Sequence, residues 1–205
     1  RDRIAFLRVC SGRFERGMKV KQGAGGKFLS VNNAITFMAR DRSTTDEAYP
    51  GDIIGIPNHG TIRLGETFTE GEDLRFTGIP SFAPEYFRLA RIANPLKIKQ
   101  LQKGLQQLAE EGATQLFRPL SGTDLILGAV GTLQFDVVAS RLEHEYGVKV
   151  IFESYNCSTA RWIHGDAGEL RQLSERYSAN VALDGADDPV YLAPNNVYLN
   201  MVKEK

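Results

Sequence analysis

The chain has 205 residues and a mass of 22.7 kDa, which is enough for one large domain or two small ones. Its formal net charge is zero, so it is not a protein that is basic throughout. Two cysteines, Cys10 and Cys157, are too few for a disulfide scaffold, and we expect both to be buried free thiols. No apolar run approaches the ~20 residues that span a bilayer. We therefore expect a cytoplasmic protein without a membrane partner, and the initial Arg1 in place of Met indicates a piece of a longer protein.

Residues 1–80 predict a domain made of short strands. Apolar or alternating segments, bounded by turn residues, recur along this region, and none keeps a helical period. The expected strands are residues 4–10, 18–21, 28–31, 34–38, 52–56, 61–64 and 74–76. Many short strands at close spacing are typical of a small antiparallel β-barrel or sandwich.

Charge in this first domain is segregated along the sequence. Residues 1–42 hold ten basic and three acidic residues, a net charge of +7. Residues 43–80 hold two basic and seven acidic residues, a net charge of −5. A basic edge of this kind suits phosphate backbones, although a solvated face of mixed sign is an equally simple interpretation. From the charge clustering, the candidate contacts with RNA phosphates are Arg13, Arg16, Lys19, Lys21, Arg40 and Arg42.

The glycine-rich stretch at residues 22–27 is not a nucleotide-binding loop. A P-loop needs a glycine five residues before its Gly-Lys pair, where this chain has Lys21. Phe28 follows Lys27, so the hydroxyl that would bind magnesium is missing as well. We expect no catalytic residue, no metal site and no bound cofactor in this chain.

Pro80 and Pro84 indicate a domain boundary, with one domain at residues 1–80 and a second at 81–205. In the second, a strand at 85–92 precedes Asn94 and Pro95, an N-cap followed by a first-turn proline. The helix after them has one apolar face, and strands follow at 114–120 and 124–130. That face consists of Ile98, Leu101, Leu105 and Leu108.

A second helix follows Gly131 and is expected to begin at the N-cap Thr132 and to end at Gly147, before a strand at 148–152. Its apolar face consists of Phe135, Val138, Leu142 and Tyr146. The order β-α-β-β-α-β is that of the split βαβ, ferredoxin-like fold. We therefore predict a β domain followed by a ferredoxin-like α+β domain.

Residues 154–205 predict an αβ extension packed on the ferredoxin-like unit. Its expected elements are strands at 158–163, 180–183 and 189–192, a helix at 168–177, and an extended segment at 196–202. Within it, Arg161, His164 and Asp166 lie close in sequence, but no nucleophile or orienting group accompanies them. His59 in a turn and His144 on a polar helix face are expected to be surface residues. Trp162 is expected in the core, and Arg118 is a candidate for a polar contact with a partner.

The first domain resembles the barrel that follows the nucleotide-binding domain in translational GTPases. The resemblance rests on Ser11-Gly12, on Gly17-Met18, on Ala-Tyr-Pro-Gly-Asp-Ile at residues 48–53 and on Thr61-Ile-Arg-Leu-Gly-Glu-Thr at 61–67. These segments occur in the order that the family has.

The second domain is similar to the bacterial peptide chain release factor three family of translational GTPases. The similar segments are Ala-Pro-Glu-Tyr-Phe at 83–87, Phe-Arg-Pro-Leu at 117–120 and Gly-Ala-Val-Gly-Thr-Leu-Gln-Phe at 128–135. The last replaces the Gly-Met-Gly-Glu-Leu-His-Leu expected of elongation factor G. The glycine-rich tip at residues 22–27 departs from the family pattern.

The resemblance implies a ribosome-docking fragment of a termination GTPase, which promotes departure of the codon-reading release factors. GTP and Mg²⁺ would bind a domain that is not in this chain. The implied partners are small-subunit ribosomal RNA and protein, the codon-reading release factors and the protein's own GTP-binding domain. Two alternatives stay open: the same domains of another translational GTPase, such as elongation factor G, and a stand-alone ferredoxin-like enzyme such as an acyl phosphatase.

Overall fold

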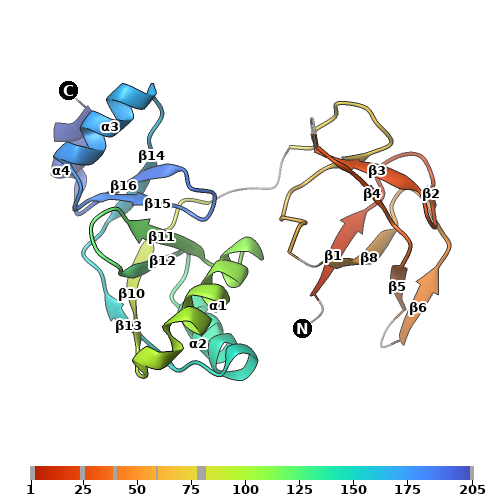
Figure 1. Ribbon diagram of the computed structural model, residues 1–205, viewed down its shortest axis with the longest axis horizontal. Helices are drawn as coiled ribbons and strands as arrows, with labels where there is room; N and C mark the ends of the chain where they lie inside the picture. Colours follow the sequence, from red (N-terminus) through yellow and green to blue (C-terminus); the bar gives the residue numbers. More distant parts are fainter. Residues whose placement is uncertain (1–2, 24–25, 39–40, 59, 78–81, 204–205) are drawn as a thin grey trace. The chain divides into compact units, whose positions relative to one another are not determined.

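A computed structural model describes residues 3–23, 26–38, 41–58, 60–77 and 82–203 of the chain. Internal contacts divide it into two units, Arg1–Ile79 (unit 1) and Pro80–Lys205 (unit 2), which are described separately (Figure 1). The division falls one residue before the boundary expected from Pro80 and Pro84. Among the described residues, no helix is long and apolar enough to cross a membrane.

Unit 1 is built from short antiparallel strands. The described strands are β1 (Arg3–Arg8), β2 (Phe14–Glu15), β3 (Lys19–Gln22), β4 (Phe28–Ser30), β5 (Ala34–Met38), β6 (Asp41–Thr45), β7 (Glu47–Ala48), β8 (Ile53–Asn58) and β9 (Phe68–Thr69). They pair in the orders β1-β8-β5-β6, β4-β3-β9 and β2-β7. One core joins these small sheets, with Phe14, Val20, Ala34, Ile54 and Ile56 buried in it. The predicted small antiparallel β domain is therefore confirmed.

Two strands expected in unit 1 are absent from the described residues, at 61–64 and 74–76. After β8, the Asn58 side chain accepts hydrogen bonds from the amides of Gly60, Thr61 and Ile62, so side-chain capping replaces strand pairing there. The amide of Phe76 likewise donates to the Thr67 hydroxyl. Conversely, polar residues form β6, which sequence periodicity did not indicate.

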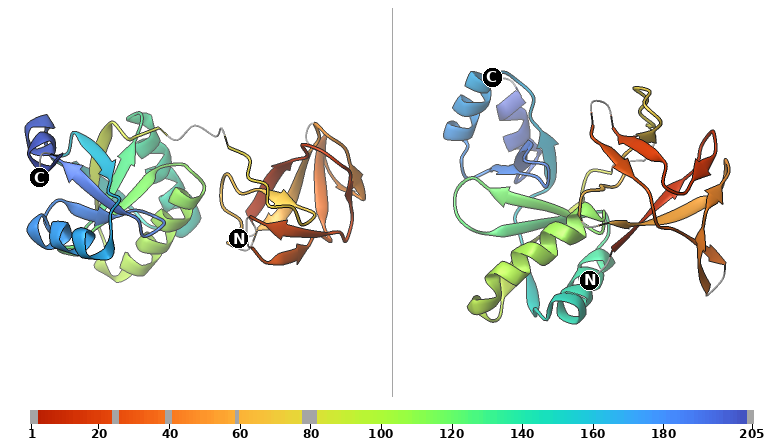
Figure 2. Two further views of the ribbon diagram at one scale, coloured as in Figure 1. Left: turned by 90° about the horizontal axis from the view of Figure 1, so that it is seen from above. Right: turned by 45° about the vertical axis from the view of Figure 1, so that its right-hand side comes forward.

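Unit 2 begins with the predicted split βαβ arrangement. Its elements are β10 (Tyr86–Ile92), the 3₁₀ turn η1 (Pro95–Lys97), α1 (Ile98–Glu110), β11 (Gln115–Pro119), β12 (Leu125–Ala129), α2 (Leu133–Tyr146) and β13 (Val150–Ser154). The strands pair antiparallel in the order β13-β10-β12-β11, the order of a ferredoxin-like sheet. Both helices lie on one side of it (Figure 2).

The two helices bury the apolar faces that the sequence predicts. Leu101, Leu105 and Leu108 of α1 lie in one core cluster with the apolar face of α2, whereas Ile98 is exposed at the start of α1. Asn94 caps η1 by accepting from the amide of Leu96, as expected. The predicted cap Thr132 is wrong in detail, because its side chain makes no cap hydrogen bond.

The turn into α2 is closed by another residue. The Gln134 side chain accepts from the amides of Val130 and Gly131, at 2.7 and 3.2 Å. At the other end of α2, Gly147 adopts the left-handed conformation expected of it, with φ of 66°.

The extension continues the same sheet. It contains β14 (Thr159–Trp162), α3 (Ala167–Arg176), β15 (Val181–Leu183), β16 (Pro189–Ala193) and α4 (Asn196–Lys203). Strand β15 pairs with β11, and β16 and β14 follow, which completes a seven-stranded sheet within unit 2. In Figure 1 these strands lie beyond β11, with α3 and α4 at the far end.

A second core covers the sheet face that turns away from α1 and α2. Phe87, Leu89, Phe117 and Ile126 point to that face, and they cluster with Ala160, Ala182, Val190 and Leu192 of the extension. Because both faces are covered, all five residues of β12 are buried. The extension is therefore part of the core of unit 2, in agreement with the prediction that it packs on the ferredoxin-like unit.

The expected extended segment at 196–202 is wrong, since these residues form α4. Asn195 starts the helix by accepting from the amides of Val197 and Tyr198. Leu199 then packs in a cluster with Tyr191 and Val202. The apolar positions 199 and 202 have helical spacing, which a search for alternation misses.

Candidate functional site

Two of the predicted phosphate-binding arginines are ion-paired within unit 1. Strands β2 and β7 pair with each other, so the basic segment 1–42 lies beside the acidic segment 43–80 at this point. Arg13 is paired with Glu15 and also approaches Glu47 at 4.0 Å. Arg16 lies 3.3 Å from Asp46 and donates to the backbone carbonyl of Asn32. Their charge is therefore partly neutralised before any partner arrives.

Lys21 is also committed to an internal partner. Its side chain is 16% exposed, and its Nζ lies 2.6 Å from the Asp73 carboxylate. The hydrogen bond from Lys21, with its charge, lowers the pKa of Asp73 below the usual 3.8. Strand β9 pairs with β3 and places Thr69 opposite Lys21. The acidic segment that holds Asp73 follows directly after β9.

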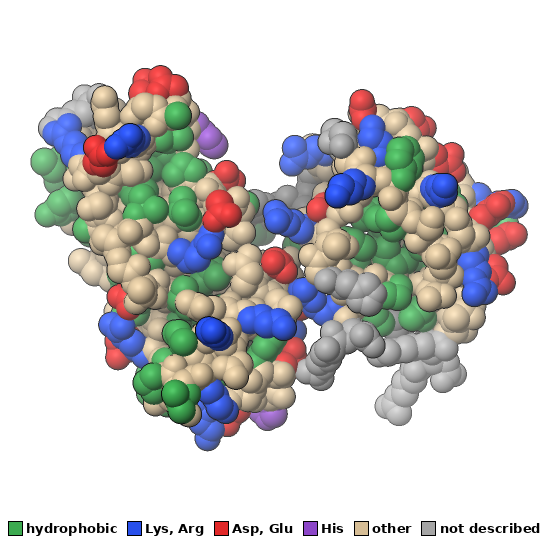
Figure 3. All heavy atoms as spheres, viewed as in Figure 1, with side chains coloured by type: hydrophobic (Ala, Val, Ile, Leu, Met, Phe, Trp, Pro, Cys, Tyr) green, Lys and Arg blue, Asp and Glu red, His purple; other side chains and the backbone are tan. Residues whose placement is uncertain are grey.

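Lys19 differs from the other candidates. It is exposed on β3, and no ion pair or hydrogen bond joins its side chain to another described residue. Arg40 lies outside the described residues, and the side chain of Arg42, on β6, is not described either. In Figure 3, basic and acidic side chains are interspersed on the visible face of unit 1. The charge segregation of the sequence therefore does not produce a wholly basic surface on the described part of this unit.

Arg118 extends from β11 to the turn before β16. Its NH2 group donates to the carbonyl of Asp184 at 3.1 Å and is ion-paired with Asp187. Its Nε is buried without a hydrogen-bond partner among the described residues. Trp162 binds the same turn, with its indole N–H 2.8 Å from Asp184 Oδ2. Arg118 thus holds the extension to the ferredoxin-like sheet, while its side chain stays 41% exposed.

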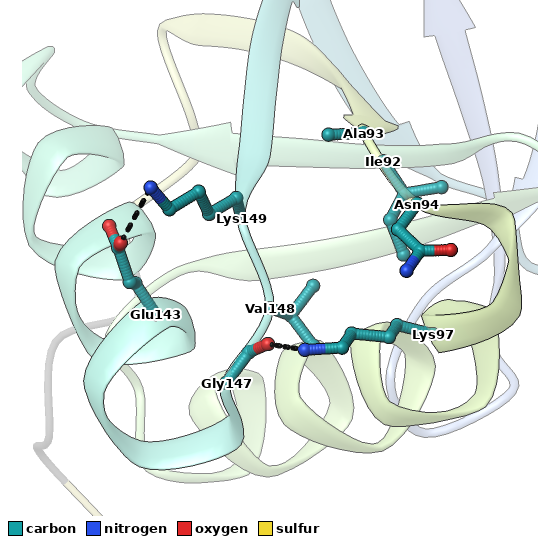
Figure 4. A pocket seen from close by; sticks show the side chains of 8 residues that line it. All are labelled: Ile92, Ala93, Asn94, Lys97, Glu143, Gly147, Val148 and Lys149. Atoms are coloured by element: carbon teal, nitrogen blue, oxygen red, sulfur yellow. Dashed lines mark hydrogen bonds and ion pairs between the residues drawn. The ribbon is translucent and has the colours of Figure 1, made fainter.

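A pocket of about 380 Å³ lies where β10 leads into η1 and α2 leads into β13 (Figure 4). Two lysines line it, and both are engaged. Lys97 donates from Nζ to the carbonyl of Gly147 at 2.5 Å, and Lys149 lies 3.3 Å from Glu143. No nucleophile stands beside a base in the lining, so the pocket offers no catalytic arrangement.

Two of the three residues that might resemble an acid–base cluster, Arg161 and Asp166, have structural roles, and His164 is exposed. Asp166 accepts from the amides of Gly168 and Glu169 and forms a capping box that starts α3. Arg161 donates to Thr159 on its own strand. His144 bonds to Ser140 one turn earlier in α2, and His59 lies outside the described residues. Among the described residues, no group of three or more His, Cys, Asp or Glu is placed to hold a metal ion.

The two cysteines lie in different environments. Cys157 is partly buried, and burial raises the pKa of its thiol to about 12. Cys10 is exposed just after β1, so the expectation that both thiols are buried is wrong for this residue. Strand β1 ends at Arg8, earlier than the apolar run indicated.

The described part of the glycine-rich tip does not fit a nucleotide phosphate. The amide of Gln22 donates to the carbonyl of Lys27, and the amide of Gly23 donates to the carbonyl of Thr67. These two N–H groups donate to backbone carbonyls, whereas in a phosphate-binding loop several backbone N–H groups donate to the ligand. The amides of Gln22 and Gly23 are therefore not available to a phosphate.

Comparisons with known proteins match two family models to the chain. A family model described as elongation factor G domain 2 matches residues 1–71, and one described as the C-terminal domain of class II release factor RF3 matches residues 76–203. A crystal structure of a protein from Thermus thermophilus is similar in fold, with a TM-score of 0.63 and 24% identity. The match covers 77% of this chain and 24% of that one. The two units are thus domains of a translational GTPase, and the chain belongs to the family of the class II release factor RF3 C-terminal domain.

Proposed function

We propose that this chain is the ribosome-docking part of a translation-termination GTPase. The whole protein would act in the cytoplasm and promote departure of the codon-reading release factors after peptide release. The observation that carries the proposal is the release-factor family match over residues 76–203, directly after a translation-factor barrel over residues 1–71.

In this proposal the chain binds and does not catalyse. GTP and Mg²⁺ would bind a separate GTP-binding domain of the same protein, and unit 1 would approach small-subunit ribosomal RNA. Unit 2 would lie near a small-subunit protein. The pairing of Arg13, Arg16 and Lys21 with carboxylates leaves Lys19 as the strongest candidate among the predicted phosphate contacts of unit 1 whose side chains are described.

A rival function is the equivalent part of an elongation factor, which the match of residues 1–71 to elongation factor G domain 2 supports. The two functions differ in the step of protein synthesis that they serve. An isolated docking module in excess should compete with the complete factor whose position it occupies.

A reconstituted termination reaction tests the proposal. The chain is added in excess to stop-codon ribosomes with a catalytic amount of codon-reading release factor and a complete release-factor GTPase. We expect slower multiple-turnover peptide release and an unchanged single round, because recycling alone needs the GTPase. Unchanged multiple-turnover release, with slowed translocation in a parallel elongation assay, would favour the elongation-factor function.

A further inference from the structure

Helix α1 carries its charges in the order opposite to the one that stabilises a helix. Residues 93–109 contain Lys97, Lys99 and Lys103 and no acidic residue, and Glu110 and Glu111 follow at the C-terminal end. The first turn of α1 has no acidic residue and the last turn has no basic one. Cations near a helix N-terminus and anions near its C-terminus oppose the helix dipole. The arrangement is unfavourable for the isolated helix. Glu111 is accounted for by its ion pair with Arg141 of α2, at 2.8 Å, which leaves the lysines to be explained.

Lys99 and Lys103 are the available cations of this group. Both are exposed, and neither has a hydrogen bond or an ion pair with another described residue. They stand one helical turn apart, at a rise of about 6 Å, so they lie on one face. Lys97 differs, because its ammonium group binds the carbonyl of Gly147. Figure 3 shows basic side chains on the face of unit 2 over the two helices.

The chemistry of this face fits a phosphate backbone better than a protein surface. Gln100 and Gln102 are exposed beside the two lysines, and lysine and glutamine side chains both donate to phosphate and sugar oxygens. Protein–protein interfaces are instead depleted in lysine and enriched in aromatic residues, which α1 lacks. The helix dipole adds to the positive potential at the same end.

We propose that Lys99 and Lys103 of α1 form a second RNA-binding surface, in unit 2, that contacts a phosphodiester backbone. It rests on the proposed function in naming ribosomal RNA as the source of the phosphates. With this surface, unit 2 would anchor to RNA directly, in addition to any contact with a small-subunit protein. Its sequence signal is the absence of acidic residues from positions 93–109.

The test compares three forms of the full chain: wild type, the double variant Lys99→Gln/Lys103→Gln, and the control Arg171→Gln. Arg171 is an exposed cation on α3 of the same unit, paired with Glu175. Binding to small ribosomal subunits and to a labelled RNA duplex is measured over a range of KCl concentrations. Each lost phosphate contact should reduce the steepness of log binding constant against log KCl concentration by about 0.7–0.9. The slope of the double variant should therefore be shallower than that of the wild type by about 1.4–1.8.

Stability separates this role from a structural one. Lysine and glutamine have similar helix propensities, and removing the charge of Lys99, in the first turn of α1, relieves its opposition to the helix dipole. The double variant should therefore unfold in urea at the wild-type midpoint or above it. Weaker RNA binding with undiminished stability, and a control with the wild-type slope, supports the proposal. A double variant with the wild-type slope overturns it.

The two probes distinguish this proposal from the proposed function. If the wild type fails to bind subunits, the proposed function fails, and the RNA duplex still tests the lysines by the same change in slope. Poly-glutamate serves as a third probe. If the double variant loses binding to poly-glutamate while its RNA slope is unchanged, an acidic protein is the partner and the proposal is overturned.

Discussion

Lys21 and Asp73 lie 52 positions apart in the sequence, yet the Lys21 ammonium nitrogen is 2.6 Å from the Asp73 carboxylate. The first residue belongs to the basic part of unit 1 and the second to the acidic part. The pairing of β3 with β9 brings these parts together and joins opposite charges across the fold. Charge that is segregated along the sequence is thus balanced in space.

The titration of the Asp73 carboxyl group should depend on Lys21. Because the pKa of Asp73 is lowered in the folded chain, the pair stabilises the fold above the unfolded pKa, near 3.8, and this contribution is lost as pH falls. Carbon NMR of the carboxyl group should give a midpoint below 3.8 in the wild type. Lys21→Met should raise the midpoint, whereas Lys19→Met, two residues away on β3, should leave it unchanged. Equal midpoints in all three forms would contradict the ion pair.

Gly128 on β12 is required for close packing, and Gly131 provides a matched control. A methyl group at position 128 would lie 2.8 Å from both Phe117 and Pro84, whereas one at 131 meets open space. Gly128→Ala should lower the free energy of unfolding by about 1–3 kcal/mol through overpacking. Gly131→Ala should leave it unchanged or raise it by up to about 1 kcal/mol. Urea denaturation measures both, and equal midpoints for the two variants would show that the site at 128 is not tightly packed.

The extension should contribute to the stability of the whole of unit 2 and unfold together with it. Leu192 on β16 is 1% exposed and lies in the core that covers the second face of the sheet. Leu192→Ala should cost about 2–5 kcal/mol of unfolding free energy. Hydrogen exchange should accelerate in β10 and β12 as well as in β16.

Val197→Ala, on the exposed face of α4, is the control for that experiment. It should change the free energy of unfolding by less than about 0.5 kcal/mol. Faster exchange confined to β14, β15 and β16 in Leu192→Ala would indicate that the extension unfolds independently.

The sequence predicted local elements better than it predicted contacts between distant segments. The apolar faces of α1 and α2 repeat within one helix, so their periodicity identified them and the split βαβ order. The segment at 196–202 was misread because Val197, Leu199 and Met201 alternate in the sequence as in a strand. In the structure Val197 and Met201 are exposed on α4, and Leu199 packs with Val202 at helical spacing. The partners of Arg16 and Lys21 depend on strand pairing across the domain, which no local pattern encodes.

The two cysteines should react at very different rates. Thiol chemistry proceeds through the thiolate, and burial raises the pKa of Cys157 to about 12. At about pH 8 an aromatic disulfide reagent should therefore modify the exposed Cys10 quickly and Cys157 slowly. Cys10→Ser should remove the fast phase, and Cys157→Ser should preserve it. A fast phase that persists in Cys10→Ser would contradict the burial of Cys157.

We propose that this chain docks on the ribosome without binding nucleotide. The most direct measurement follows its sedimentation with small ribosomal subunits over a range of KCl concentrations, with a fluorescent GTP analogue present. We predict binding that weakens as salt increases, because phosphate contacts release counterions, and no association with the nucleotide. Tight nucleotide binding, or no binding to the subunits at low salt, would contradict the account.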